Sequence, residues 1–125
     1  MRTEPPRIVY GPAYGPRTEW ENFVLGQALQ EAQGQVSGHV RGIAVEAGYE
    51  AVVIHACLDA EEPDTIEDLE ELVHDLDGVL EDLAVPAPTV RLQLHVGDTD
   101  PDWSGYDHRR LYLMHWRTRE GYVPE

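Results

Sequence analysis

The sequence predicts an α+β fold, with two helices packed on one face of a four-stranded, largely antiparallel sheet. Two segments, residues 18–33 and 65–83, repeat apolar residues at the three- and four-residue spacing of amphipathic helices. Four further segments are rich in Val, Ile and Leu, a composition typical of strands. Their order along the chain is helix, two strands, helix, two strands. This order favours a layer of helices against a layer of sheet.

The chain has 125 residues, which suits one domain with a single core. We expect residues 1–16 to form an arm rich in Pro, Gly and Tyr, and residues 17–125 to form the domain. Four of the nine prolines lie in the arm, and proline lacks the amide donor that helices and strands use.

The first helix is expected to begin at Thr18, because Thr18 and Glu21 have the spacing of a capping box. Gly34 can take the left-handed conformation that ends a helix, so the helix should stop near Gln33. Its apolar residues form one face for the core: Trp20, Phe23, Val24, Ala28 and Leu29.

Residues 39–47 and 50–59 predict a β-hairpin that turns at Gly48-Tyr49. The apolar residues of its first strand do not alternate cleanly, which indicates a bulge or two partly covered faces. Because side chains alternate across a sheet, the second strand has one core face, formed by Val52, Ile54, Ala56 and Leu58.

The second helix, residues 65–83, has the clearest pattern in the chain, and Asp64 or Thr65 is expected to cap it. One face repeats Ile, Leu and Val, and the other is acidic. Half of the 24 Asp and Glu residues lie between residues 59 and 82, where no Arg occurs. Like charges at helical spacing destabilise a helix by about 0.2–0.5 kcal/mol per pair. An acidic face without basic partners is therefore a candidate for function.

The last two strands are expected at residues 90–96 and 110–117, with a polar loop over residues 97–107. The final strand is apolar on both faces, which indicates an inner strand or a face that meets a partner. The strand before it alternates polar residues with an apolar set, Val90, Leu92, Leu94 and Val96.

The formal net charge is -15, because 24 acidic residues face nine Arg and no Lys. A field of this sign repels phosphate backbones and anionic lipid, so we expect no binding to nucleic acid or to a membrane. A basic protein is the expected partner.

We expect a cytoplasmic location in a bacterium. Residues 1–16 lack the apolar stretch of a secretory signal, and no apolar run approaches the ~20 residues of a membrane helix. Cys57 is the only cysteine, so no disulfide can form within the chain, which fits a reducing compartment. The use of Arg without Lys is typical of a GC-rich genome.

Residues 98–102 resemble the start of a calcium-binding loop, but the rest of that motif is missing. These residues place acids at alternate positions, as calcium loops do. However, Trp103 and Arg109 occupy the positions that need Gly and Glu. No Gly-rich phosphate loop and no Gly-x-Ser-x-Gly motif is present either.

Metal-ligating and nucleophilic side chains occur without a motif. His55, Cys57, His95 and His115 could share one sheet face, but no zinc spacing is present. Catalysis by Cys57 with a neighbouring His meets the same objection. We therefore expect no catalytic residue, no metal ligand and no cofactor. A metal-dependent enzyme that uses His55, His95 and His115 is the least supported alternative.

The chain from Trp20 to Arg117 resembles the small acidic immunity proteins that bacteria make against their own polymorphic or contact-dependent toxins. The resemblance rests on the helix segment Leu25-Gly26-Gln27-Ala28-Leu29, the strand Val40-Arg41-Gly42-Ile43-Ala44-Val45, the hairpin end Leu58-Asp59-Ala60-Glu61-Glu62-Pro63, and the acidic helix after it. It implies a non-enzymatic protein that binds one toxin domain and blocks its active site or substrate entry. Many such toxins are nucleases with basic clefts, which an acidic inhibitor would occupy.

The binding face is expected to combine the acidic side of the second helix with the loop after residue 97. The expected contact residues are Glu67, Asp68, Glu70, Glu71, Asp75, Asp98, Asp100, Asp102, Trp103 and Tyr106. Trp103 either provides a binding hot spot or packs over the edge of the core. The alternative function is a homodimeric structural or small-ligand-binding domain that pairs through the sheet face opposite the helices.

Overall fold

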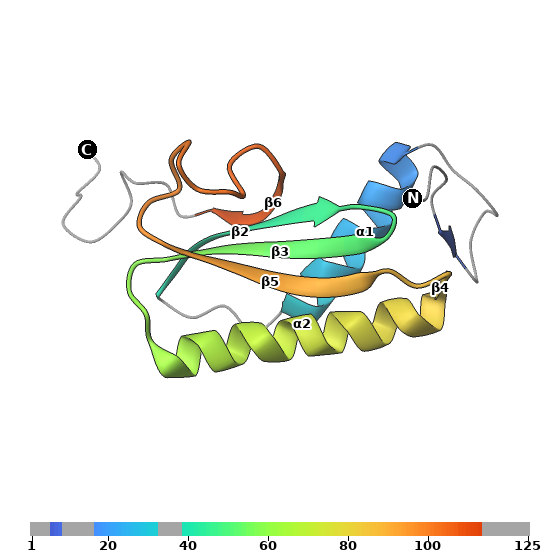
Figure 1. Cartoon of the computed structure of the whole chain (residues 1–125), viewed down its shortest axis with the longest axis horizontal. Helices are drawn as coiled ribbons and strands as arrows, with labels where there is room; N and C mark the ends of the chain where they lie inside the picture. The colour runs from blue at the N-terminus through green and yellow to red at the C-terminus, as the bar shows by residue number, and fades with distance from the viewer. Residues whose placement is uncertain (1–5, 9–16, 33–38, 114–125) are drawn as a thin grey trace.

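The computed structural model describes residues 6–8, 17–32 and 39–113 (Figure 1). The elements in chain order are β1 (Arg7–Ile8), α1 (Arg17–Ala32), β2 (Val40–Ala47), β3 (Ala51–Leu58), α2 (Pro63–Leu83), β4 (Ala84–Val85), β5 (Thr89–Val96) and β6 (Arg109–Leu113). The α+β class and the order of its main helices and strands are confirmed.

The main sheet has the strand order β5-β3-β2-β6 and is mixed. β2 pairs antiparallel with β3, which confirms the predicted hairpin, and antiparallel with β6 on its other side. β3 and β5 pair in parallel, so the prediction of a largely antiparallel sheet is only partly correct. The cause is the length of α2. Its 21 residues rise about 32 Å, more than the about 26 Å of the eight-residue β3, so α2 returns the chain to the end where β3 starts.

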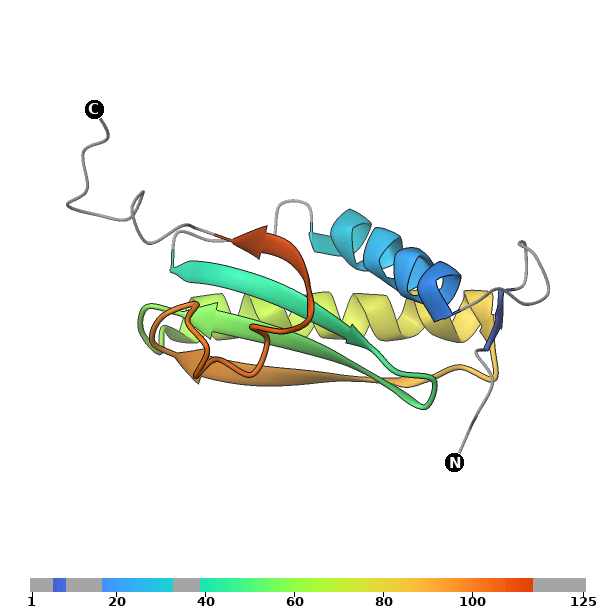
Figure 2. The ribbon, with the colours of Figure 1, turned by 90° about the horizontal axis from the view of Figure 1, so that it is seen from above.

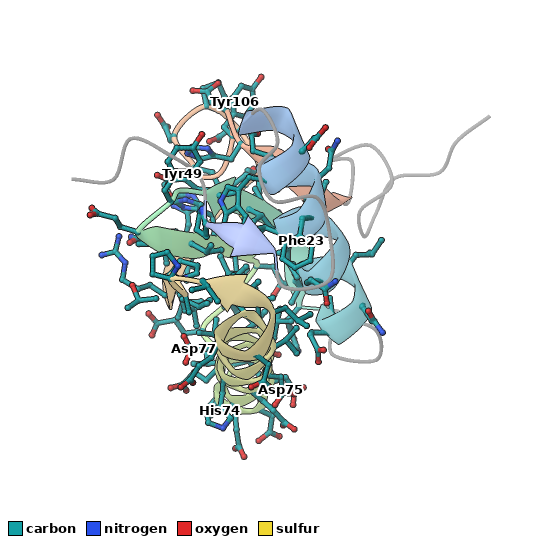
Figure 3. The ribbon with its side chains drawn as sticks, turned by 90° about the vertical axis from the view of Figure 1, so that its right-hand side faces the viewer. Phe23, Tyr49, His74, Asp75, Asp77 and Tyr106 are labelled. Carbon is teal, nitrogen blue, oxygen red and sulfur yellow. The ribbon has the colours of Figure 1, made fainter. Side chains whose placement is uncertain are left out.

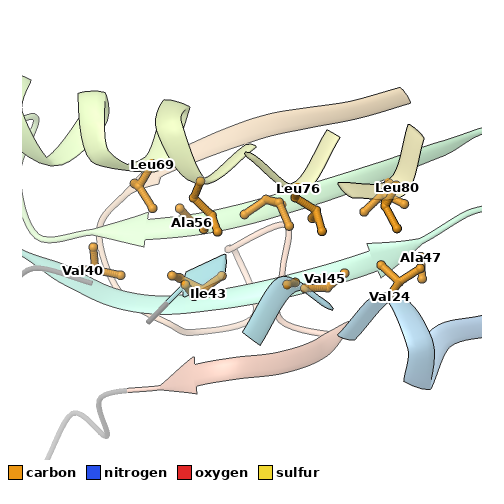
Figure 4. Close-up of a cluster of buried hydrophobic side chains, with 14 of the residues drawn as sticks. Val24, Val40, Ile43, Val45, Ala47, Ala56, Leu69, Leu76 and Leu80 are labelled. Atoms are coloured by element: carbon orange, nitrogen blue, oxygen red, sulfur yellow. The ribbon is translucent and has the colours of Figure 1, made fainter. Parts of the chain in front are cut away.

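Both helices cover the same face of the sheet, as predicted, and α1 packs beside α2 (Figure 2). One hydrophobic cluster fills the space between the helices and the sheet. Figure 4 shows leucines of α2 pointing toward β2 and β3 across this cluster. The predicted core face of β3 is confirmed, because its four residues all belong to the cluster: Val52, Ile54, Ala56 and Leu58.

The irregular pattern of β2 reflects a bulge. The register between β2 and β3 shifts between Val40 and Gly42. Val40, Ile43 and Val45 consequently all reach the core, although they do not share one parity in the sequence. Ala44 is buried with Trp103 on the opposite face, so both explanations offered by the sequence, a bulge and two partly covered faces, are confirmed.

α1 differs from the sequence prediction at its start and on its apolar face. It begins at Arg17, so Thr18 lies inside the first turn and is not the cap. Leu29 was expected in the core but is 51% exposed. The buried residues are spaced four apart, and Leu29 lies beyond that stripe: Trp20, Val24, Ala28 and Ala32. The Trp20 indole N–H also donates to the Gly48 carbonyl oxygen at 3.1 Å.

α2 begins at Pro63, and its N-cap is Glu62, not Asp64 or Thr65 as predicted. The Glu62 carboxylate accepts hydrogen bonds from the Thr65 backbone N–H at 2.8 Å and from the Thr65 hydroxyl at 2.9 Å. These two bonds lower the pKa of Glu62 below its ordinary value, and the bond from the Thr65 backbone N–H has the larger effect. Pro63 suits the first helical turn because backbone N–H groups there have no acceptor within the helix, so the N–H that proline lacks costs no hydrogen bond.

The two ends of the chain are described only in part. In the expected arm, Arg7–Ile8 pairs antiparallel with Ala84–Val85. The last strand, expected to run to Arg117, is described as far as Leu113, and residues 114–117 lie outside the described residues. Among the described strands β6 lies at an edge of the sheet, so the inner-strand interpretation is wrong there, and the two-sided apolar character of the strand stays a prediction.

Candidate functional site

The face of α2 that points away from the core is acidic. No basic residue lies in its last turn, and no Arg occurs from residue 59 to 82 of the sequence. Among the described residues, no helix is long and apolar enough to cross a membrane. The five contact residues predicted on this helix lie on or beside the acidic face: Glu67, Glu70 and Glu71 are exposed, and Asp68 and Asp75 are half-buried.

A groove of about 690 Å³ lies between α2 and β5. β5 is an edge strand, which has β3 on one side and, within the described ranges, no strand on the other. The apolar part of the groove is lined by Ile66, Val73, Val90, Leu92 and Leu94, and its polar part by Glu70, His74, Arg91 and Gln93. An acidic helix face therefore borders an apolar depression beside an open sheet edge.

The acids of the loop between β5 and β6, residues 97–108, partly hold the loop itself. Asp98 accepts a hydrogen bond from the Arg41 guanidinium of β2 at 2.6 Å. The Asp100 carboxylate accepts one from the Asp102 backbone N–H at 3.0 Å. Asp102 and Tyr106 are exposed. The predicted contact residues Asp98 and Asp100 thus have structural roles in the loop.

Trp103 corrects one predicted contact. The side chain is 1% exposed and packs with Ala44 and Cys57 on the sheet face opposite the helices. Its indole therefore offers no surface to a partner, and the second of the two predicted roles, packing over the sheet, is the one observed. A Cβ on Gly105 would lie 2.5 Å from the indole ring, so a side chain there would displace the ring, and a Cβ on Gly42 would be in tight contact with it at 3.1 Å.

The two parts of the predicted binding face lie on opposite sides of the sheet. α2 packs on the face formed by Val52, Ile54 and the other core residues, whereas the loop packs on the face that carries Cys57. Figure 3 shows the separation, with Tyr106 at one end of the molecule and Asp75 and Asp77 at the other. The acidic helix and the acidic loop do not form one continuous surface.

A polar cluster lies on the loop side of the sheet. His55 is 5% exposed, and its ring has Nδ1 at 2.8 Å from the Ser104 hydroxyl and Nε2 at 2.8 Å from a Glu46 carboxylate oxygen. His108 Nε2 lies 3.4 Å from the same carboxylate oxygen. The His55 and His108 rings are stacked, with centroids 5.0 Å apart. Three ligand-type side chains and one hydroxyl thus meet at one point.

Sequence reasoning found only His55 of this cluster. Glu46 lies diagonally across from His55, because β2 pairs Ala44 with His55. The register Val45 to Arg109 brings the preceding residue, His108, beside Glu46. The available signal was Glu46, the one acidic residue of a mostly apolar strand, but the strand pairing is needed to interpret it.

The other side chains considered for a metal site are not part of this cluster. Within the described ranges, the group formed by Glu46, His55 and His108 is the one set of three ligand-type residues close enough to share an ion. Cys57 is buried and its thiol donates to the Gly97 carbonyl oxygen at 3.5 Å. His95 is outside the group, and His115 lies outside the described residues.

No protein-family profile matches this chain. No curated protein matches it either. The acidic helix face with its groove and the polar cluster are therefore the features that bear on its function.

Proposed function

We propose that this protein is a non-enzymatic binding protein that captures a basic protein partner on its α2 side, as an immunity protein neutralises its cognate toxin. The observation that carries the proposal is the groove between α2 and β5, because it joins the acidic face of α2 to an apolar depression at an open sheet edge. Protein interfaces combine a desolvated apolar centre with a charged rim in this way.

Charge supports the same conclusion. The acids of α2 have no Arg on their own helix to offset their repulsion, so they weaken the fold slightly in the free protein. A basic partner would relieve that repulsion and would be steered toward this face by the negative field. A nuclease with a basic cleft is a partner of this chemistry.

The apolar groove can supply the binding affinity that exposed charges alone do not. Exposed ion pairs contribute little net affinity, whereas apolar side chains placed in a desolvated pocket dominate binding energy. Ile66, Val73 and Leu92 are partly exposed in the groove. We propose that the partner inserts an apolar side chain there and places basic side chains over Glu67 and Glu70.

The alternative, a homodimer paired through the sheet face opposite the helices, has less support. Residues 97–108 cover part of that face, and the residues they contact are buried: His55, which is hydrogen-bonded to Ser104, is 5% exposed, and Cys57, which packs with Trp103, is 0% exposed. Less apolar surface is then left on the described part of that face for a second copy.

The proposal is tested by co-expressing the protein with the product of the adjacent gene and measuring the dissociation constant at increasing NaCl. We expect Glu67→Gln/Glu70→Gln to weaken binding about tenfold at low salt, because two charges leave the steering face, and the difference to shrink as salt screens it. Asp102→Asn/Asp107→Asn is the matched control, since it removes two exposed acids from the loop on the opposite face.

The control distinguishes an effect of the α2 face on binding from an effect of the net charge of the protein. Equal weakening by both double variants would mean that net charge, and not the α2 face, governs binding. Stronger weakening by the loop variant would place the interface on the other side of the sheet. Failure of the two proteins to associate would remove the proposed toxin partner.

A further inference from the structure

The sheet face opposite the helices carries a cluster of metal-ligating side chains that the proposed function does not use. Glu46 comes from β2, His55 from β3 and His108 from the end of the loop that covers them. One ligand atom from each lies within 4.8 Å of the others. We infer that these three residues bind a zinc ion through two imidazole nitrogens and one carboxylate oxygen.

The donor set fits zinc. Two His and one Glu form a known type of zinc site, with a fourth position open to water or another ligand. Ligand atoms at about 2.0–2.2 Å from a tetrahedral zinc lie about 3.3–3.6 Å from one another. His55 Nε2 and His108 Nε2 lie 2.8 Å and 3.4 Å from the Glu46 oxygen. Side-chain adjustments of less than 1 Å would satisfy these two separations.

His55 is already oriented as a ligand. A zinc-binding imidazole usually donates its other ring N–H to an oxygen, which fixes its tautomer and direction. In the free chain the His55 Nε2–H donates to the Glu46 carboxylate at 2.8 Å, so the ion would replace that proton. Nδ1 lies 2.8 Å from the Ser104 hydroxyl and would then carry the ring proton and donate it to Ser104. Because His55 is buried, its ring direction is held by packing as well.

His108 supplies the movement that binding needs. Its ring is stacked on that of His55 at an interplanar angle of 9°, and the lone pairs of parallel rings do not converge on one ion. The His108 side chain is 35% exposed and that of Glu46 is 45% exposed, so both can turn toward a shared ion. Binding would exchange the stacked pair for a coordinated pair and would tie the loop to the sheet.

The site lies on the opposite side of the sheet from α2, so the zinc inference is independent of the proposed partner. The simplest competing explanation is a hydrogen-bonded cluster that only fastens the loop. The two explanations differ in zinc affinity, because a cluster with a purely structural role takes up no ion.

The test uses the full chain, purified without a His tag and treated with chelator. Zinc affinity is measured by competition with a chromophoric chelator, and Co²⁺ is added as a spectroscopic probe of tetrahedral coordination. We expect one ion per chain. Glu46→Gln and His108→Gln should each weaken binding at least tenfold, and Ser104→Ala, which removes the oxygen that orients His55, about 10- to 100-fold. Circular dichroism checks that each variant folds.

His39→Gln is the matched control. His39 is also paired with a carboxylate, Asp59, at 3.0 Å, but it is not part of the three-residue group. Its substitution should leave zinc affinity unchanged. Absence of zinc uptake by the unaltered chain, unchanged affinity in both Glu46→Gln and His108→Gln, or equal loss in His39→Gln would each overturn the inference.

Discussion

Trp103 shows how one side chain shapes the face of the molecule opposite the helices. The loop after β5 is polar, and its apolar anchor is this indole, which lies between Gly42 of β2 and Gly105 of the loop. The indole N–H is buried and has no hydrogen-bond partner among the described residues. Packing, and not a hydrogen bond of its own, therefore holds the indole ring in place. The Trp103 backbone is hydrogen-bonded within the loop, because its N–H donates to the Asp100 carbonyl oxygen and its carbonyl oxygen accepts from the Tyr106 N–H, both at 3.0 Å.

Replacing Trp103 with Ala should lower the free energy of unfolding by about 3–5 kcal/mol, because a fully buried indole is removed and a cavity remains. Urea denaturation followed by circular dichroism measures the loss. Tyr106→Ala in the same loop is the control, since Tyr106 is 37% exposed and should cost under about 1 kcal/mol. A cost below about 1 kcal/mol for Trp103→Ala would mean that the indole does not anchor the loop.

At the scale of elements, α2 performs two tasks with its two faces. Its inner face supplies four fully buried leucines to the core, Leu69, Leu72, Leu76 and Leu80. Its outer face presents the acids and one wall of the groove. The helix can tolerate that charge because its start is well capped, and acids near the helix N-terminus interact favourably with the macrodipole. Toward the last turn the same charges are unfavourable.

The capping by Glu62 predicts a pH dependence of stability. Its pKa is lower in the folded chain than its ordinary value of 4.5, so its contribution is complete above that value and is lost as pH falls through the lowered pKa. Glu62→Ala should therefore reduce the urea midpoint at neutral pH, and the difference from the unaltered chain should shrink below about pH 4.

Glu61→Ala is the control for this effect, because Glu61 is an exposed neighbouring acid that does not form the cap. It should leave the urea midpoint nearly unchanged across the same pH range. A Glu62→Ala effect of equal size at pH 3 and pH 7 would show that the charge of Glu62 has no part in capping.

At the scale of the whole molecule, the order in which the elements pack on the sheet decides which face each candidate site occupies. The β3-α2-β5 crossover places α2 on one side of the sheet, and the β5-to-β6 loop crosses to the other. The proposed partner surface and the proposed zinc site therefore occupy opposite faces. The net charge of -15 affects the electrostatic field at both faces.

Self-repulsion of that charge predicts that salt stabilises the fold. Between about 0.02 M and about 0.5 M NaCl the screening length falls several-fold, so the urea midpoint should rise, by an amount equivalent to about 1 kcal/mol. Glu67→Gln/Glu70→Gln/Glu71→Gln should start from a higher midpoint and gain less with salt. A midpoint that is independent of salt would show that the acidic face does not strain the free protein.

The sequence by itself determined the features that depend on local periodicity. The amphipathic spacing of residues 65–83, the alternation in β3 and the Gly48-Tyr49 turn predicted the helix, the core face and the hairpin, because each reflects neighbours only a few residues apart. The acidic face of α2 follows from the same spacing. The cap residue Glu62 and the exposed Leu29 were missed, since helix ends and the edges of an apolar stripe depend on one or two residues.

Only the tertiary structure decided which faces and strands meet. The parallel pairing of β3 with β5, the burial of Trp103 and the separation of the acidic loop from α2 all depend on strand order. The cluster of Glu46, His55, Ser104 and His108 joins the β2-β3 hairpin to the loop after β5, which is far from it in the sequence. No local pattern encodes such contacts, because they are produced by strand register and by a loop that folds back over the sheet.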